Sequence, residues 1–208
     1  MTANARGCRS RKFDVDKTRA MLEGHVEWCD KYLPSTVTAQ DVMAIIPCGL
    51  ARPGPYTKEG LPIIIIKVEN YDPTQFHDVD LFVKYCAYNF YAVAHRLPPG
   101  AEKGVLFFDM RGWSLWKHAN SHSMKLVGIL IKIIQDQNPE RLQKAVLFNA
   151  PAIFSATWKL IKVLLDPVVA AKVVFVNDVD TVLQMVHASD LPKEYGGERT
   201  EPYPIVAE

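Results

Sequence analysis

Residues 145–176 read AVLFNAPAIFSATWKLIKVLLDPVVAAKVVFV and combine two kinds of hydrophobic pattern. Two runs, Ala145–Phe148 and Val173–Val176, are apolar throughout, and they flank a segment that predicts a helix over Ser155–Leu165. Unbroken hydrophobicity is typical of strands that are covered on both faces, as in a parallel sheet. The stretch therefore predicts a strand, a crossover helix and a second, parallel strand.

The same alternation extends toward the N-terminus. Ile63–Val68 and Val105–Met110 are apolar runs of strand length, and Val79–Arg96 and Ser121–Gln137 carry apolar residues at helical spacing. Asp78 directly precedes the first of these helices and is predicted to be its N-cap residue. Strands that alternate with helices predict an α/β fold with a parallel-dominated sheet.

The first fifty residues have a different pattern. Phe13–Leu33 predicts a helix that ends at Pro34, and a loop rich in Pro and Gly over residues 47–62 leads into the first strand. We therefore divide the chain into a short helical N-terminal subdomain, residues 1–50, and an α/β domain, residues 51–208.

Composition excludes several classes of protein. The chain has 208 residues, 49% of them hydrophobic, and 24 basic against 23 acidic side chains, which argues against disorder and against nucleic-acid binding. The longest apolar stretch, Leu126–Ile134, is far shorter than the ~20 residues that span a bilayer, and no secretory signal is visible. The four cysteines form no C-x-x-C pair, so we expect reduced thiols, with Cys86 buried, in a soluble cytoplasmic protein.

The motif scan finds no convincing catalytic or metal centre. Ser114 follows a predicted strand after Gly112, but Trp116 stands where a nucleophile elbow needs a small residue. His118 and His122 lack a third ligand, which favours a capping or solvated role for them. We expect neither an enzyme nor a bound cofactor or metal ion.

Six short motifs follow one another in an order that matches a known family. They are Ser10–Val15 (SRKFDV), Asp109–Gly112 (DMRG), Asn138–Arg141 (NPER), Asn149–Pro151 with Phe154, Asp166-Pro167, and Leu191–Gly197 (LPKEYGG). Together they resemble the CRAL-TRIO lipid-binding domains from about residue 10 to residue 197. The resemblance is strongest to the branch that transfers phosphatidylinositol.

This resemblance implies a sheet that floors an apolar lipid cavity, closed by a helical gate over Phe154–Leu165. The residues it assigns to cavity and gate are Leu106, Phe108, Phe148, Phe154, Trp158, Ile161 and Leu165. The gate segment is apolar on nearly all sides, which fits a helix between cavity and membrane, although a plain core helix would also show it.

The resemblance also implies a headgroup site made of Arg11, Lys12, Glu140 and Lys172. Cations suit a buried phosphodiester, and a carboxylate accepts hydrogen bonds from inositol hydroxyls.

Three positions depart from the family pattern. The hydroxyl pair that holds phosphatidylcholine aligns with Gly104 and Leu106, and a Thr of the inositol site aligns with Val169. These departures argue against exchange of choline lipids.

The predicted function is lipid transfer by a monomer that touches membranes transiently, with phosphatidylinositol as the expected cargo. Two alternatives remain. The first is a carrier of a retinoid, tocopherol or sterol, because Asn70–Phe76 and Asp109–Trp113 are similar to that branch. The second is a lipid-regulated module that binds a partner protein.

Overall fold

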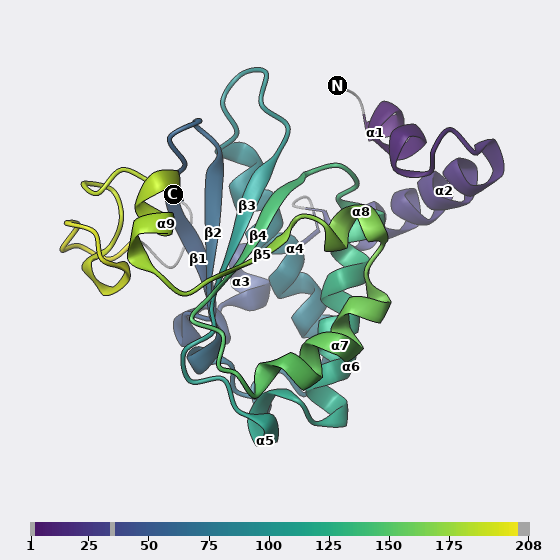
Figure 1. The fold of residues 1–208 in the computed structure, drawn as a ribbon. Coiled ribbons are helices and arrows are strands. Elements are labelled where there is room, and N and C mark those ends of the chain that lie inside the picture. Colours follow the sequence, from purple (N-terminus) through teal and green to yellow (C-terminus); the bar gives the residue numbers. More distant parts are fainter. Residues whose placement is uncertain (1–2, 34–35, 204–208) are drawn as a thin grey trace.

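The computed structural model describes residues 3–33 and 36–203 (Figure 1). Its centre is a five-stranded sheet in the order β1-β2-β3-β4-β5. The strands are β1 (Ala51–Tyr56), β2 (Pro62–Lys67), β3 (Gly104–Asp109), β4 (Leu142–Phe148) and β5 (Val173–Val176). Strands β2 to β5 run parallel, and β1 pairs antiparallel with β2. The predicted α/β fold with a parallel-dominated sheet is confirmed.

Helices connect the strands and cover the sheet. The helices of the α/β body are α4 (Val79–His95), α5 (Leu115–His118), α6 (Ser121–Lys132), α7 (Phe154–Leu164), α8 (Pro167–Ala170) and α9 (Val179–Met185), with short turns η2 (Val68–Asn70) and η4 (Lys193–Tyr195). Asp78 caps α4 as predicted, since its carboxylate accepts from the backbone N–H of Asp80 at 2.8 Å. The helix predicted over Ser121–Gln137 changes to a π-helical turn, η3 (Ile133–Gln137), after α6.

Strand β1 corrects the prediction that residues 47–62 form a loop. Pro53 and Pro55 argue against a strand because proline has no N–H for the ladder. At the edge of a sheet, however, one side of the strand has no partner, so proline is tolerated there. Pro53 accordingly lies opposite Ile64 in the β1–β2 pair.

The two faces of the sheet are covered differently. Helices α4, α6 and α7 lie over one face, and α9 and the C-terminal segment lie over the other (Figure 1). On the second face Phe107, Phe148 and Tyr195 form an aromatic cluster with ring centroids 5.2–6.0 Å apart. Residues alternate between the faces along each strand, because strand side chains have a period of two.

The N-terminal region is helical as predicted, but it begins earlier. It contains α1 (Ala3–Ser10), which was not predicted, and then α2 (Val15–Tyr32), α3 (Ala39–Val42) and η1 (Ile46–Cys48). Lys12 and Phe13 have φ angles of 54° and 62°, so the chain turns sharply between α1 and α2. The boundary at residue 50 stays a prediction. Cys86, on α4, is buried as predicted.

Candidate functional site

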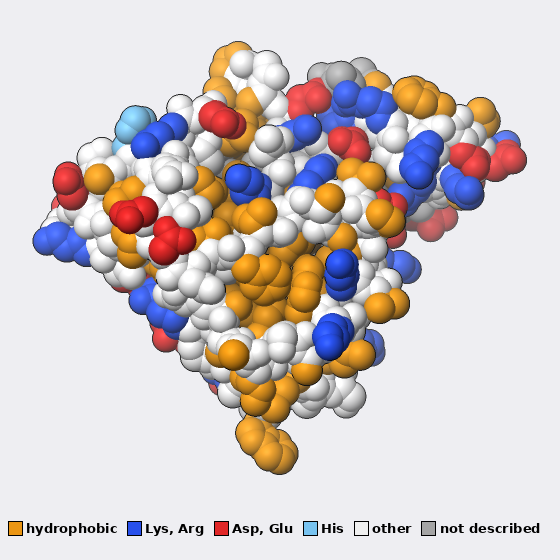
Figure 2. Space-filling view, in the orientation of Figure 1, with side chains coloured by type: hydrophobic (Ala, Val, Ile, Leu, Met, Phe, Trp, Pro, Cys, Tyr) orange, Lys and Arg blue, Asp and Glu red, His pale blue; other side chains and the backbone are white. Residues whose placement is uncertain are grey.

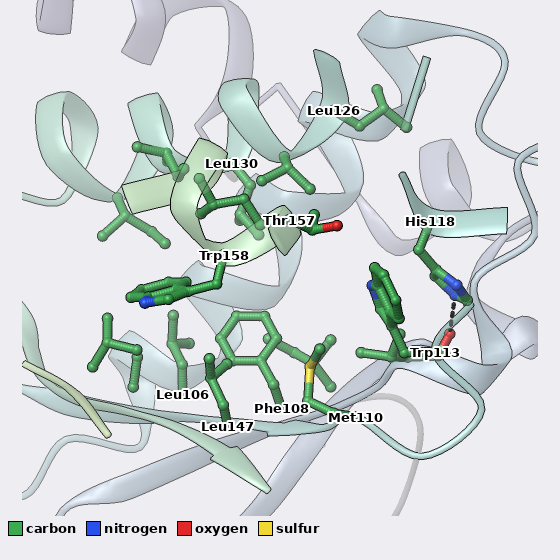
Figure 3. A pocket seen from close by; sticks show the side chains of 18 of the residues that line it. Leu106, Phe108, Met110, Trp113, His118, Leu126, Leu130, Leu147, Thr157 and Trp158 are labelled. Carbon is green, nitrogen blue, oxygen red and sulfur yellow. Dashed lines mark hydrogen bonds between the residues drawn. The ribbon is translucent and has the colours of Figure 1, made fainter. Parts of the chain in front are cut away.

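An apolar cavity of about 220 Å³ lies between the sheet and its helices. Its floor comes from side chains of β2, β3 and β4 that point to one face, and its walls come from α6 and α7 (Figure 3). Figure 2 shows an apolar hollow at the centre of the molecule, beside α7. Hydrophobic side chains form nearly all of the lining, so a bound molecule would meet almost no polar atoms.

The lining contains most of the residues that the sequence assigned to it. Those present are Leu106, Phe108, Phe154, Trp158, Ile161 and Leu165. Phe148 is the exception: it packs on the opposite face with Phe107 and Tyr195, and its neighbour Leu147 lines the cavity instead. The register explains this correction, because Phe148 pairs with Asp109 and Leu147 pairs with Phe108.

Helix α7 forms the outer wall of the cavity. Phe154, Thr157, Trp158 and Ile161 face inward, at a helical spacing of three or four residues. Its other side leaves Val163 83% exposed. The helix is thus apolar toward the cavity and toward solvent, as its sequence indicated. Asn149, with a φ of 54°, turns the chain from β4 toward this helix.

An aromatic contact joins α7 to the sheet. The ring of Phe175, on edge strand β5, packs against Trp158 and Phe154, with centroid distances of 5.4 and 6.4 Å. We call Phe154, Trp158 and Phe175 the aromatic latch. It holds α7 against the edge of the sheet.

Polar groups gather at the α5 end of the cavity, where the sequence predicted none. Tyr71 and Ser123 share a hydrogen bond of 2.9 Å. His118 is buried, so the predicted solvated role is wrong. The alternative capping role is confirmed, because its Nδ1 accepts a hydrogen bond from the backbone N–H of Ser114, the N-cap residue of α5. Its Nε2 donates to the carbonyl of Val68 at 3.0 Å. Burial lowers the pKa of His118 below its usual 6.5.

A second pocket, of about 80 Å³, contains all four predicted headgroup residues. Arg11, Lys12, Glu140 and Lys172 line it, although they come from distant parts of the chain. Sequence reasoning missed Arg9, Ser10 and Asp166, which also line this charged pocket. The available signal for Arg9 was the pair of basic residues, Arg6 and Arg9, just before the SRKFDV motif.

The charged pocket adjoins the apolar cavity. Ile134, Leu142 and Val169 line both of them, so a charged compartment meets an apolar one at this boundary. An amphipathic molecule has the same division into a polar head and an apolar tail.

Backbone and ion pairs shape the charged pocket. Lys12 and Glu140 have φ angles of 54° and 60°, a left-handed conformation that is uncommon for residues other than glycine. Arg11 forms an ion pair of 2.7 Å with Asp136, which lies on the π-helical turn η3. Within residues 3–33 and 36–203, no ion pair engages the side chains of Lys12, Glu140 or Lys172. Their charges are therefore available to a ligand.

The comparison with family models decides the classification. The model of the CRAL/TRIO domain matches residues 52–197. The chain belongs to the CRAL/TRIO domain family. The motifs quoted from the sequence therefore identified the family correctly.

Curated relatives match almost the whole chain. It is 26% identical to the phosphatidylinositol/phosphatidylcholine transfer protein SFH12 of Arabidopsis thaliana, over 92% of this chain and 38% of that protein. It is 26% identical to the phosphatidylinositol transfer protein CSR1 of Eremothecium gossypii, over 91% of this chain and 45% of that protein. It is 28% identical to the SEC14 cytosolic factor of Kluyveromyces lactis, over 91% of this chain and 68% of that protein. The chain spans less than half the length of the first two. The predicted resemblance to the phosphatidylinositol-transfer branch is confirmed.

The fold also matches a solved structure. The crystal structure of Sfh5 aligns with a TM-score of 0.81 at 20% identity, over 96% of this chain and 72% of that one. Among the described residues of this CRAL/TRIO protein, none of the helices combines the length and the hydrophobicity of a membrane-spanning segment. The same residues contain no group of three or more His, Cys, Asp or Glu side chains placed to hold a metal ion.

Proposed function

We propose that this protein takes a phospholipid, phosphatidylinositol in the first place, from one membrane and delivers it to another. The observation that carries the proposal is the boundary at Ile134, Leu142 and Val169, where the apolar cavity meets the charged pocket. Acyl chains would occupy the cavity and the headgroup would occupy the pocket. The names of the transfer-protein relatives support the same function.

The charged pocket suits an inositol phosphodiester. Lys12 and Lys172 offer ammonium donors to the phosphate, and Glu140 offers acceptors to ring hydroxyls. Arg11 is positioned by Asp136 at the same pocket. Acyl chains discriminate little between lipids, so these polar contacts would set the specificity.

Loading requires the gate to open. A cavity of about 220 Å³ is smaller than the ~300–1,000 Å³ of typical sites for drug-sized ligands, and a two-chain phospholipid is larger than such ligands. Helix α7 would therefore swing away from β5 and break the aromatic latch. Exposure of the cavity is costly in water, at about 0.8 kcal/mol per CH₂ of cargo, so opening would take place on a membrane.

The gate side of the protein is suited to a membrane surface. Exposed apolar side chains on and around α7 are Ile153, Leu160, Val163, Leu164 and Val168, and Lys159 and Lys162 stand among them. Trp116, on α5, is 93% exposed, and Figure 2 shows an apolar projection at the lower tip where Figure 1 places α5. Trp favours the interface between water and lipid, and Lys favours anionic headgroups. We propose that this side docks transiently, on a monomer in the cytoplasm.

The test measures lipid transfer between vesicles. The double variant Glu140→Gln with Lys172→Met should lose most transfer of phosphatidylinositol while it still binds other hydrophobes. A matched control, Lys193→Met with Glu198→Gln, removes the same charges from exposed positions near the C-terminus and should transfer normally. A wild-type protein that extracts no lipid from vesicles overturns the proposal.

A carrier of a non-phospholipid hydrophobe is the second candidate. The nearly apolar lining and the absence of hydroxyls at Gly104 and Leu106 favour it. Native mass spectrometry of the purified protein separates the two candidates by ligand mass. Neither candidate involves catalysis.

A further inference from the structure

The hydroxyl of Thr157 is an unpaired polar group in the wall of the apolar cavity. Thr157 lies on the inner side of α7 and is only 4% exposed. Within residues 3–33 and 36–203 its hydroxyl makes no hydrogen bond to the protein. Figure 3 shows the oxygen pointing into the cavity, toward the side where Trp113 lies. Buried hydroxyls normally have a partner, so this group calls for one.

The neighbouring polar groups are already satisfied. Ser123 donates to the carbonyl of Lys117 at 2.8 Å, and Tyr71 shares a hydrogen bond of 2.9 Å with Ser123. Both ring nitrogens of His118 are bonded to backbone atoms. These groups form hydrogen bonds within the protein, whereas the Thr157 hydroxyl is free to bond to a molecule inside the cavity.

Trp113 supplies a second polar atom at this end. Its ring packs edge-on against Phe154, one turn before Thr157, with centroids 5.2 Å apart. In the described part of the chain no acceptor is bonded to its indole N–H. Trp113 and Thr157 both line the cavity, so a donor and a hydroxyl face the same space.

The pair is remote from the charged pocket. Thr157 precedes the last residue of α7, Leu164, by seven positions, or roughly 10 Å along a helix axis. Asp166 and Val168, just beyond that end, line the charged pocket. A lipid with its headgroup in the pocket would therefore bring the middle part of its tail to Thr157 and Trp113.

We propose that Thr157 and Trp113 form a polar subsite for an oxygen atom, a hydroxyl or a carbonyl, that the cargo carries on its tail. Thr157 would donate or accept one hydrogen bond, and Trp113 would donate one. The preferred cargo would then be an oxygenated lipid rather than one with plain hydrocarbon chains. This inference rests on the proposed function, because it assumes that lipid tails enter the cavity.

The test is a competition between two phosphatidylinositols that differ only by one hydroxyl near the middle of an acyl chain. Both are offered in equal amounts in phosphatidylcholine vesicles, and native mass spectrometry measures which is loaded. The wild-type protein should enrich the hydroxylated lipid roughly 3- to 10-fold, the range expected for one buried hydrogen bond.

Variants locate the preference. Thr157→Val keeps the shape of the side chain and should lower the loading ratio, because only the Trp113 donor remains, and Thr157→Ser should retain the preference. Ser155→Ala, on the exposed side of the same helix, is the matched control and should leave the ratio unchanged. Equal loading of both lipids by the wild-type protein overturns this inference alone. Failure to load either lipid contradicts the proposed function instead.

Discussion

The two faces of the sheet carry similar side chains but are packed in opposite ways. On one face Phe107, Val146 and Phe148 are at most 3% exposed and pack against α9 and Tyr195. On the other face Leu106 and Phe108 border a cavity of about 220 Å³. Hydrophobic strands therefore do not by themselves produce a solid core. The elements that cover a face determine whether it is filled.

On the packed face, the C-terminal segment folds closely on itself. Gly197 lies against Leu191, and a Cβ atom at Gly197 would overlap the Leu191 carbonyl. Glycine permits this contact because it has no side chain. On the hollow face, bulky side chains of α6 and α7 stand between the helix backbones and the strands (Figure 3).

Phe107→Ala and Phe108→Ala test this contrast most strongly, since the two residues are adjacent but face opposite ways. We expect Phe107→Ala to lower the free energy of unfolding by about 3–5 kcal/mol, because it opens a new cavity in a solid core. Phe108→Ala should cost clearly less, because its side chain already borders empty space. Urea denaturation measures both. Equal losses would contradict the contrast between the faces.

Gly197→Ala tests the close approach on the packed face. We expect a loss of about 1–3 kcal/mol, typical of overpacking, because the new methyl group displaces the Leu191 backbone. Gly128→Ala on α6 is the control, since a Cβ there meets nothing within 4 Å. That change should stabilise the protein by about 0.5–1 kcal/mol, since alanine is the better helix former. Thermal unfolding of both variants checks the difference in sign.

Phe175→Ala should affect exchange more than stability. It removes the aromatic latch partner from β5, and aromatic pairs contribute about 0.5–1.5 kcal/mol beyond burial. We expect the dissociation rate of bound lipid to rise about 2- to 10-fold. Tyr91→Ala, which removes a comparably exposed ring from α4, should leave that rate unchanged. A normal rate in Phe175→Ala would show that the latch does not restrain the gate.

His118 should give the smallest effect, a pH dependence of stability. Its pKa is lowered in the folded protein, so the unfolded chain binds a proton more readily. The contribution of neutral, buried His118 to the free energy of unfolding is therefore present above the usual pKa of 6.5 and is lost as the pH falls below that value. Chemical denaturation from about pH 7.5 to pH 5 should show this loss, and His118→Gln should reduce it. An unchanged pH profile in the variant would exclude His118 as the cause.

Much of the fold was accessible from the sequence because its signals are local. Unbroken apolar runs located β2 to β5, and helical periodicity located α4, α6 and α7 to within a few residues. Strand β1 was missed because prolines normally argue against a strand, and edge position overrode that preference.

The site was less accessible because it depends on tertiary register. Phe148 and Leu147 are equally hydrophobic, and only pairing with β3 determines which of them faces the cavity. Only the resemblance to a family predicted that Arg11 and Glu140 share a site, because no local sequence rule connects residues so far apart in the chain. Thr157 gave no sequence signal, because an unpaired hydroxyl shows itself only in a packed structure.

The edges of the sheet have a consequence for aggregation. Pro53 and Pro55 on β1 remove backbone donors from one edge, and β5 at the other edge is only four residues long. Neither edge offers a long, complete ladder to a strand of another molecule. Opening of the proposed gate would therefore expose the apolar hollow without presenting an edge on which copies could assemble into fibrils.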